Sequence, residues 1–245
     1  MFTEEARNWV RDRLLQRASD DRRVVAAAVV GSLALGGGDR WSDLDLSFGV
    51  ANEVPLQEVL EDWTRWMVAE FDATQLFDLA SGASIYRVFL LPGCLQCDVS
   101  FTPAAQFGAT SARFRLVFGT AVEKAHLAAR PACELFGWAV HHALRARVCL
   151  ERGRFWEGEY WVSNLRDYAL SLACRRRGLA TTYGRGFDDL PAEVRAEFVS
   201  ALPTSLAREE LLQALRAGID ALLRESAEAE DLGAKLEPQL RELMQ

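Results

Sequence analysis

The chain has 245 residues, 50% of them hydrophobic and 26% charged, which is the composition of a globular protein and excludes a mainly disordered one. Its 35 acidic and 28 basic residues leave a formal net charge of −7 at pH 7, which argues against the broad binding of nucleic-acid duplexes that clustered cations support. A nucleotide ligand stays open, because it needs only a local site.

The first 120 residues read as a mixture of helices and strands. Apolar residues at helical spacing predict the first helix, and the apolar run that follows it is typical of a strand buried on both faces. Acidic and apolar residues then alternate, which predicts a second strand. In chain order we expect a helix at 4–18, strands at 23–30 and 43–50, a helix at 55–71, strands at 74–79, 84–91 and 94–101, and a short strand or turn at 114–118.

After Gly119 the strand signals stop and only helical patterns follow. We expect helices at 131–150, 155–177, 191–201, 205–224 and 235–244. The sequence therefore predicts an α+β fold in two domains. The first, at 1–120, holds a mixed sheet flanked by helices, and the second, at 121–245, is a helical bundle.

The sequence carries no signal for export or for a membrane. No window holds the ~20 consecutive apolar residues of a membrane span, and residues 1–23 lack the apolar stretch of a secretory signal. The five cysteines form no recognisable disulfide framework. We expect a cytoplasmic protein with reduced thiols and no membrane partner.

Gly31 and Ser32 end the first predicted strand, a place where anions bind in many folds. Where such a strand ends beside a helix start, backbone N–H groups open toward solvent, and together with a hydroxyl they hold phosphate oxygens. Glycine also allows a ligand to approach the backbone closely. We interpret the pair as a candidate phosphate site.

Asp43 and Asp45 follow after a spacer of ten residues and project from the same face of one strand. Two carboxylates this close repel each other unless a cation lies between them, and Mg²⁺ prefers such oxygen ligands. Asp98 stands on a later strand, and a third carboxylate joins the pair if that strand lies beside 43–46. Three carboxylates beside a phosphate site indicate metal-assisted phosphoryl or nucleotidyl transfer.

These residues resemble the signature of the nucleotidyltransferases that share the DNA polymerase β-like fold. That signature is hydrophobic-Gly-Ser, a spacer of about ten residues, Asp-hydrophobic-Asp and a later isolated acid on a neighbouring strand. This chain supplies Val30-Gly31-Ser32, Asp43-Leu44-Asp45-Leu46 and Asp98. The helical half that follows resembles that of antibiotic nucleotidyltransferases, which act on aminoglycosides or lincosamides.

The resemblance implies a role for each residue. Asp43 and Asp45 would bind two Mg²⁺ ions, and Asp98 would be the third metal ligand or the base that takes the proton of the acceptor hydroxyl. Gly31 and Ser32 would hold the β- and γ-phosphates of ATP or another nucleoside triphosphate. The acceptor hydroxyl would attack the α-phosphorus and release pyrophosphate.

One stretch departs from the family. Some antibiotic-modifying members carry an arginine soon after Gly-Ser that contacts the triphosphate, whereas residues 33–38 of this chain are leucine, alanine and glycine. Arg40 is the nearest cation and the candidate to replace it. Ser42, next to the acidic pair, completes the residues that we assign to nucleotide binding.

In the helical half, Glu159, Ser163 and Arg166 share one helix face. If that face lines the cleft, Glu159 is a candidate acceptor contact or general base, and Arg166 a phosphate contact. Asp98 and Glu159 both stay open as the base.

The sequence thus predicts a Mg²⁺-dependent nucleotidyltransferase that moves a nucleoside monophosphate, AMP from ATP in the first instance, onto a small hydroxylated acceptor. An aminoglycoside or lincosamide antibiotic would make it a resistance enzyme, and the net acidity favours a polycationic aminoglycoside. A protein-adenylating antitoxin and an inactive nucleotide-binding regulatory module are the alternatives. Nucleic acid is disfavoured as a partner, and both a monomer and a homodimer stay open.

Overall fold

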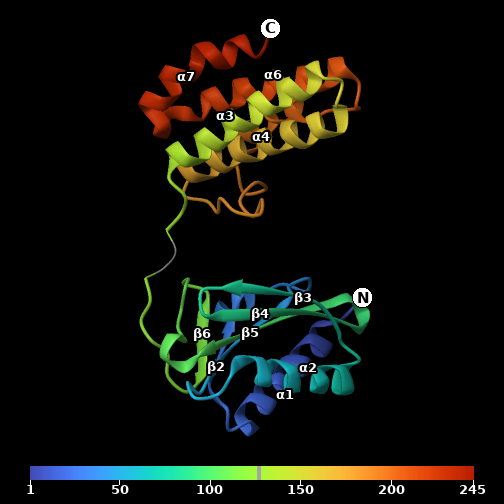
Figure 1. The fold of residues 1–245 in the computed structure, drawn as a ribbon, viewed down its shortest axis with the longest axis vertical. Coiled ribbons are helices and arrows are strands. Elements are labelled where there is room, and N and C mark those ends of the chain that lie inside the picture. The colour runs from blue at the N-terminus through green and yellow to red at the C-terminus, as the bar shows by residue number, and fades with distance from the viewer. Residues whose placement is uncertain (126–127) are drawn as a thin grey trace. The chain divides into compact units, whose positions relative to one another are not determined.

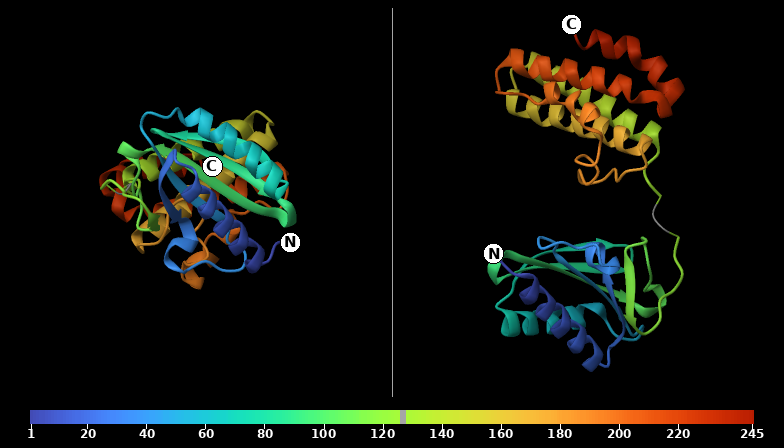
Figure 2. Two further views of the ribbon diagram at one scale, coloured as in Figure 1. Left: turned by 90° about the horizontal axis from the view of Figure 1, so that it is seen from below. Right: turned by 180° about the vertical axis from the view of Figure 1, so that it is seen from behind.

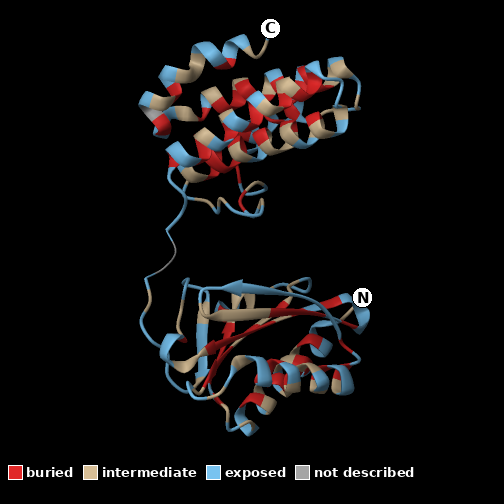
Figure 3. Ribbon diagram, in the orientation of Figure 1, coloured by how far each residue is buried: buried red, intermediate tan, exposed pale blue. Residues whose placement is uncertain are grey.

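The computed structural model describes residues 1–125 and 128–245, and the chain divides into two compact units, Met1–Leu127 and Ala128–Gln245. Figure 1 shows the two units, and each has its own core of buried apolar residues, which are among those coloured red in Figure 3. The first unit mixes strands and helices, and the second is helical. The predicted α+β fold is therefore confirmed. No helix among the described residues is long and apolar enough to cross a membrane.

The first unit is built on a six-stranded mixed sheet with the strand order β3-β4-β5-β2-β1-β6. Its strands are β1 (Val24–Val30), β2 (Leu44–Val50), β3 (Thr74–Ser81), β4 (Ser84–Leu91), β5 (Leu95–Pro103) and β6 (Phe114–Phe118). Its helices are α1 (Glu4–Asp20) and α2 (Leu56–Phe71), with short 3₁₀ turns at η1 (Gly31–Leu35), η2 (Pro92–Cys94) and η3 (Ala104–Gln106).

Helices α1 and α2 pack against the same face of this sheet (Figures 1 and 2). The side chains of a strand alternate between its two faces. Along β2, Leu44, Leu46 and Phe48 therefore point into the core beneath the helices, while Asp45 and Ser47 point to the opposite face. The hydrophobic effect holds β2 in this orientation, because a shift by one residue would bury the aspartate.

The pairing of β2 with β5 decides what lies on that opposite face. These two strands run parallel, joined through α2 and the β3–β4 hairpin, whereas every other pairing in the sheet is antiparallel. Their register sets Asp45 directly beside Asp98, and Ser47 beside Ser100. The condition stated for Asp98 from the sequence, a strand lying next to 43–46, is met.

The second unit packs its helices around one apolar core. The helices are α3 (Ala132–Glu151), α4 (Phe155–Arg176), α5 (Ala192–Ala196), α6 (Arg208–Arg224) and α7 (Glu230–Glu242), with 3₁₀ turns at η4 (Val199–Ala201) and η5 (Ser226–Ala229). A tight turn at Gly153, whose φ of +69° suits glycine, joins α3 to α4. The apolar stripe of α6 is buried against both.

The helix expected at 191–201 is wrong in one respect. The structure ends α5 at Ala196 and continues after a break as the 3₁₀ turn η4. Phe198 and Ala201 lie at and after this break, and both are almost fully buried in the core. Packing against α4 and α6 outweighs local helix propensity here.

Candidate active site

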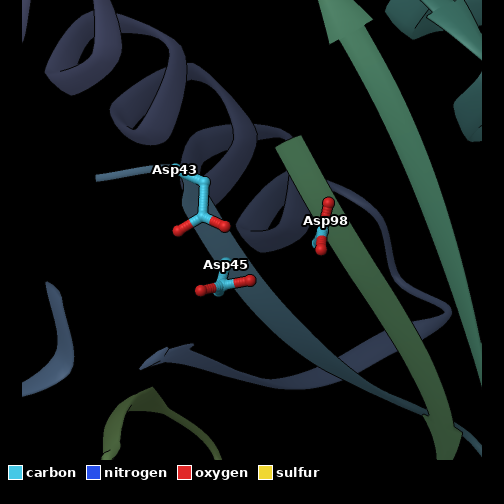
Figure 4. A group of neighbouring side chains, drawn as sticks. All are labelled: Asp43, Asp45 and Asp98. Carbon is cyan, nitrogen blue, oxygen red and sulfur yellow. The ribbon is translucent and has the colours of Figure 1, made fainter. Parts of the chain in front are cut away.

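Three carboxylates converge on the open face of the sheet. Asp43 comes directly before β2, Asp45 lies on β2 and Asp98 lies on β5. One carboxylate oxygen from each lies within 4.8 Å of the other two, as Figure 4 shows for the side chains. The parallel register brings Asp98 to Asp45, and the chain just before β2 brings Asp43 to both.

The acidic cluster is only partly exposed to water, and this affects Asp98 in particular. Burial raises the pKa of Asp98, the side-chain amide of Gln96 lowers it by donating a hydrogen bond at 3.0 Å, and the nearby charge of Asp43 raises it again; the net direction is upward. In the described part of the chain, neither Asp43 nor Asp98 forms an ion pair with an arginine or lysine. Negative charge therefore accumulates at this point of the sheet.

Hydroxyl groups lie next to the carboxylates on the same face. Ser100 donates a hydrogen bond to Ser47 at 2.8 Å. These serines lie two residues after Asp98 and Asp45 on their strands and therefore share the same face. Tyr86 on β4 pairs with Ser100 in the sheet register. Burial raises the pKa of the Tyr86 phenol, and the charge of Asp45 adds to this effect. These hydroxyls were not among the predicted site residues, although alternation along β2 and β5 puts the two serines on this face.

Gly31 lies against the cluster because it has no side chain. A Cβ at this position would come within 2.1 Å of Oδ2 of Asp45, and its φ of +69° is one that other residues rarely adopt. The Gly31 N–H donates to the carbonyl of Arg113 at 3.2 Å, so it is not available to a phosphate as the sequence analysis expected. The adjacent Ser32 hydroxyl has no hydrogen-bond partner within the described residues.

Ser42 and Arg40 lie in the loop that leads into β2. The Ser42 hydroxyl accepts a hydrogen bond from the backbone N–H of Asp39 at 3.0 Å and lies 3.1 Å from Oδ1 of Asp39, so it braces the loop. The guanidinium of Arg40 stacks on the exposed ring of Trp41, 4.2 Å from its centroid. Both residues belong to the loop that positions Asp43, and the Arg40 side chain is exposed to solvent.

Arg7 on α1 holds this loop in place, and it was not among the residues predicted for the site. This α1 side chain is only 4% exposed, and its Nη1 donates to the carbonyls of Asp39 at 2.6 Å and Ser42 at 2.9 Å. The signal was available in the sequence, because Arg7 stands on the buried stripe of α1 with Val10 and Leu14. A cation at such an inward position needs acceptors, and here they are loop carbonyls.

Glu159 and Arg166 belong to α4 in the helical unit, where each has a partner close in sequence. Glu159 accepts a hydrogen bond from the Ser163 hydroxyl at 2.6 Å. The guanidinium of Arg166 forms two bonds to Oδ1 of Asp167, at 2.9 and 3.0 Å. The predicted shared face of Glu159, Ser163 and Arg166 exists, since Arg166 also reaches the Ser163 hydroxyl at 3.5 Å.

The donor set fits a hard divalent cation. Mg²⁺ takes oxygen ligands and usually binds one or two protein carboxylates together with substrate phosphates. Asp43, Asp45 and Asp98 offer three carboxylate oxygens to one point of space, and a Cβ at Gly31 would intrude on one of them. Such a cation would also relieve the repulsion among the three carboxylates.

Comparison with solved structures gives several similarities at low sequence identity, two of which are described below. No family model and no curated protein matches the chain. An aminoglycoside 6-adenyltransferase from Bacillus subtilis is similar at 12% identity, over 99% of both chains, with a TM-score of 0.41. MenT4, a nucleotidyltransferase toxin from Mycobacterium tuberculosis, is similar at 16% identity, over 97% of this chain and 90% of its own, with a TM-score of 0.26. At TM-scores below 0.5, neither similarity assigns a function to this chain.

Proposed function

We propose that the protein is a Mg²⁺-dependent nucleotidyltransferase that moves AMP from ATP onto a hydroxyl group of a small acceptor and releases pyrophosphate. The observation that carries the proposal is the convergence of Asp43, Asp45 and Asp98 from two parallel strands. Three carboxylates placed together repel one another, and a bound cation would relieve that repulsion.

Asp43, Asp45 and Asp98 would hold the metal. When bound, divalent cations neutralise charge on the phosphates and on the attacking and leaving oxygens of an in-line displacement. The contribution of the chain is a rigid ligand set, with Asp45 and Asp98 fixed by strand register and Asp43 by the loop that Arg7 holds. Rigid placement of this kind lowers the cost of organising charge during the reaction.

The triphosphate would lie beside η1. The Ser32 hydroxyl is a suitable donor to a phosphate oxygen, and Gly31 lets the ligand approach without a side chain in the way. Arg40, on the exposed loop, is the candidate cation for the outer phosphates. Ser42 contributes through the loop, because its hydroxyl is engaged with Asp39.

Asp98 is the proposed base. The acceptor oxygen forms a bond to the α-phosphorus, the bond from that phosphorus to the bridging oxygen breaks, pyrophosphate leaves and the acceptor proton passes to a carboxylate oxygen of Asp98. Glu159 is the second candidate base, and we rank it lower because Ser163 already occupies one of its oxygens.

The helical unit is proposed to bind the acceptor, with Arg166 as a candidate phosphate contact. Aminoglycosides and lincosamides are the first acceptors to test, because each offers hydroxyl groups, and activity on either would indicate a role in antibiotic resistance.

The test is calorimetric titration of a non-hydrolysable ATP analogue into the full chain, with and without Mg²⁺. We expect Mg²⁺-dependent binding that is lost in the double variant Asp43→Asn/Asp45→Asn. The matched control is Asp12→Asn/Asp20→Asn, which removes two exposed carboxylates from α1 and should leave binding unchanged.

Failure of the wild-type protein to bind the analogue in the presence of Mg²⁺ would overturn the proposal. Binding that needs no Mg²⁺ and survives the double variant would favour a regulatory nucleotide-binding module. If binding follows the proposal, pyrophosphate release with the antibiotic panel then identifies the acceptor.

A further inference from the structure

A cavity of about 420 Å³ lies in the helical unit, between α4 and the loop that follows it. This volume is within the range of small-molecule sites. None of the sequence-predicted site residues lines it. Its lining residues are Arg130, Leu135, Asp167, Tyr168, Ser171, Thr181, Thr182, Tyr183, Gly184 and Phe187.

One wall of the cavity is a rigid aromatic surface. The ring of Tyr168 stacks on His142, with centroids 5.1 Å apart, and on Trp138, at 6.3 Å and nearly parallel. His142 is 5% exposed, and its Nδ1 has no hydrogen-bond partner among the described residues. Burial, with a smaller effect of His141, lowers the pKa of His142 to about 4, so the layer behind Tyr168 is uncharged at neutral pH.

Tyr183 is a second aromatic residue in the lining of the cavity. Its side chain is 91% exposed, and its φ of +58° is rare for a bulky residue. Backbone of this kind persists where the surrounding structure fixes it, and it is frequent at ligand sites. The guanidinium carbon of Arg185 lies over the Tyr183 ring, 5.5 Å from its centroid.

The polar groups of the lining carry balanced charge. Oδ1 of Asp167 already accepts two bonds from Arg166. Arg130 is held by its carbonyl, which accepts a bond from Arg175, and its guanidinium lies 3.5 Å from the Tyr168 hydroxyl. Arg130 also lies 3.9 Å from Glu134, so the one cation and the one anion of the lining each have an oppositely charged neighbour. The other polar groups of the lining are the hydroxyls of serine, threonine and tyrosine side chains.

We propose that this cavity binds an uncharged, hydroxylated ring of sugar or cyclitol type. Aromatic faces suit the apolar faces of such a ring, and hydroxyl groups suit its polar edge. A polycation is disfavoured, because it needs several unpaired carboxylates and the cavity offers only Asp167, which Arg166 neutralises. Only the identification of this ring as the acceptor rests on the proposed function, since an acceptor needs a free hydroxyl; the binding site itself does not.

The experiment compares matched probes on the full chain by saturation-transfer NMR and by tryptophan fluorescence, since Trp138 stacks behind the cavity wall. myo-Inositol and maltose are the uncharged probes, 2-deoxystreptamine is the dicationic cyclitol of the same ring size, and adenosine is the nucleoside probe. We expect saturable binding of an uncharged probe in the millimolar range, which is typical of ligands this small. Binding of 2-deoxystreptamine should be at least about tenfold weaker.

Variants tie the signal to the cavity. Tyr183→Ala removes an exposed ring and should weaken binding about tenfold, while Tyr183→Phe keeps the ring and most of the affinity. Trp156→Ala is the matched control, because Trp156 is an exposed aromatic residue of the same unit that does not line the cavity. It should leave the affinity unchanged.

The inference is overturned if no uncharged probe binds, if adenosine or 2-deoxystreptamine binds more tightly, or if Tyr183→Ala and Trp156→Ala have equal effects. Titration of the ATP analogue with Mg²⁺ on the same samples reports the proposed function separately. Binding of the ring without binding of the ATP analogue would support the cavity assignment and refute the transferase proposal. Binding of the ATP analogue without binding of any ring probe would refute the cavity assignment and leave the transferase proposal standing.

Discussion

The candidate residues on α4 and those on the sheet differ in whether their charged groups have partners close in sequence. On α4, Glu159 accepts a hydrogen bond from Ser163 one helical turn away, and Arg166 pairs with its chain neighbour Asp167. On the sheet, Asp98 lies far along the chain from Asp43 and Asp45, and the fold brings the three like charges together. Side chains with a hydrogen-bond or ion-pair partner nearby need no ligand, whereas a bound cation would relieve the repulsion in a cluster of like charges. We therefore expect the chemistry on the sheet.

The largest expected effect comes from breaking the cluster. Asp45→Asn replaces one of the three carboxylates with a neutral amide and so removes charge that a metal would balance. We expect pyrophosphate release to fall on the order of 100- to 1000-fold, with an unchanged circular dichroism spectrum. Activity within a factor of two of the wild type would show that the cluster is not catalytic.

Gly31→Ala tests the close approach of η1 to the same cluster. The new Cβ would lie 2.1 Å from Oδ2 of Asp45 at a φ of +69°, so we expect roughly 3 kcal/mol less unfolding free energy in urea and weaker Mn²⁺ binding. Gly82→Ala is the matched control, since Gly82 has a similar φ of +59° and nothing within 4 Å. It should cost only about 1 kcal/mol and leave Mn²⁺ binding unchanged. Equal losses in the two variants would mean that backbone strain alone is responsible.

In the helical unit, pH should affect stability through His142. Its pKa in the folded protein is lowered from 6.5 to about 4, chiefly by burial, so the unfolded chain binds its proton first as the pH falls. Stability is fully present above the unfolded value and is lost as the pH falls from about 6.5 toward 4. We expect the unfolding free energy to drop by about 2 kcal/mol between pH 7 and pH 5, measured by urea titration.

The variant His142→Phe should remove most of this loss, because it has no group to protonate in the unfolded chain. His141→Phe, at the exposed neighbour, should retain it. A pH dependence that persists in His142→Phe would refute the assignment to this histidine.

A smaller effect is expected from Arg7, which acts on the cluster only through the loop before Asp43. Arg7→Met removes the bonds to the carbonyls of Asp39 and Ser42, so we expect Mn²⁺ affinity to fall about tenfold, as for other residues that orient metal ligands. Arg7→Lys should restore part of it. The control is Arg13→Met, at another arginine of α1, which removes the ion pair with Glu70 of α2.

Titrations of the three variants below their unfolding temperatures separate metal affinity from stability. If Arg7→Met loses stability but binds Mn²⁺ as the wild type does, its role is structural only.

The smallest effect should come from Glu159→Gln. The amide keeps a hydrogen bond with Ser163, and we expect a change in stability below about 0.5 kcal/mol and turnover within a factor of two. A loss of turnover as large as that of Asp45→Asn would reverse the comparison and make Glu159 the base.

Much of the site could be predicted from sequence because local rules govern it. The two-residue period of a strand puts Asp43 and Asp45 on one face, and a glycine is needed wherever a Cβ would collide with a neighbour. The site roles of these residues stay predictions until the titrations are made. Ser42 shows where sequence reasoning fell short, because its hydroxyl closes a loop with Asp39, a contact that spacing alone does not indicate.

By itself, the sequence determined most of the strands and helices, the α+β class and the spacing that puts Asp43 and Asp45 on one face, since hydrophobic periodicity and residue spacing depend only on neighbours along the chain. Only the tertiary structure decided that Asp98 joins that pair, because this required β5 to lie parallel to β2 in one particular register. It also decided that Arg7 is buried beneath the loop and that Tyr168 and Tyr183 enclose one cavity. Such contacts join residues far apart in sequence, and packing rather than local preference selects them.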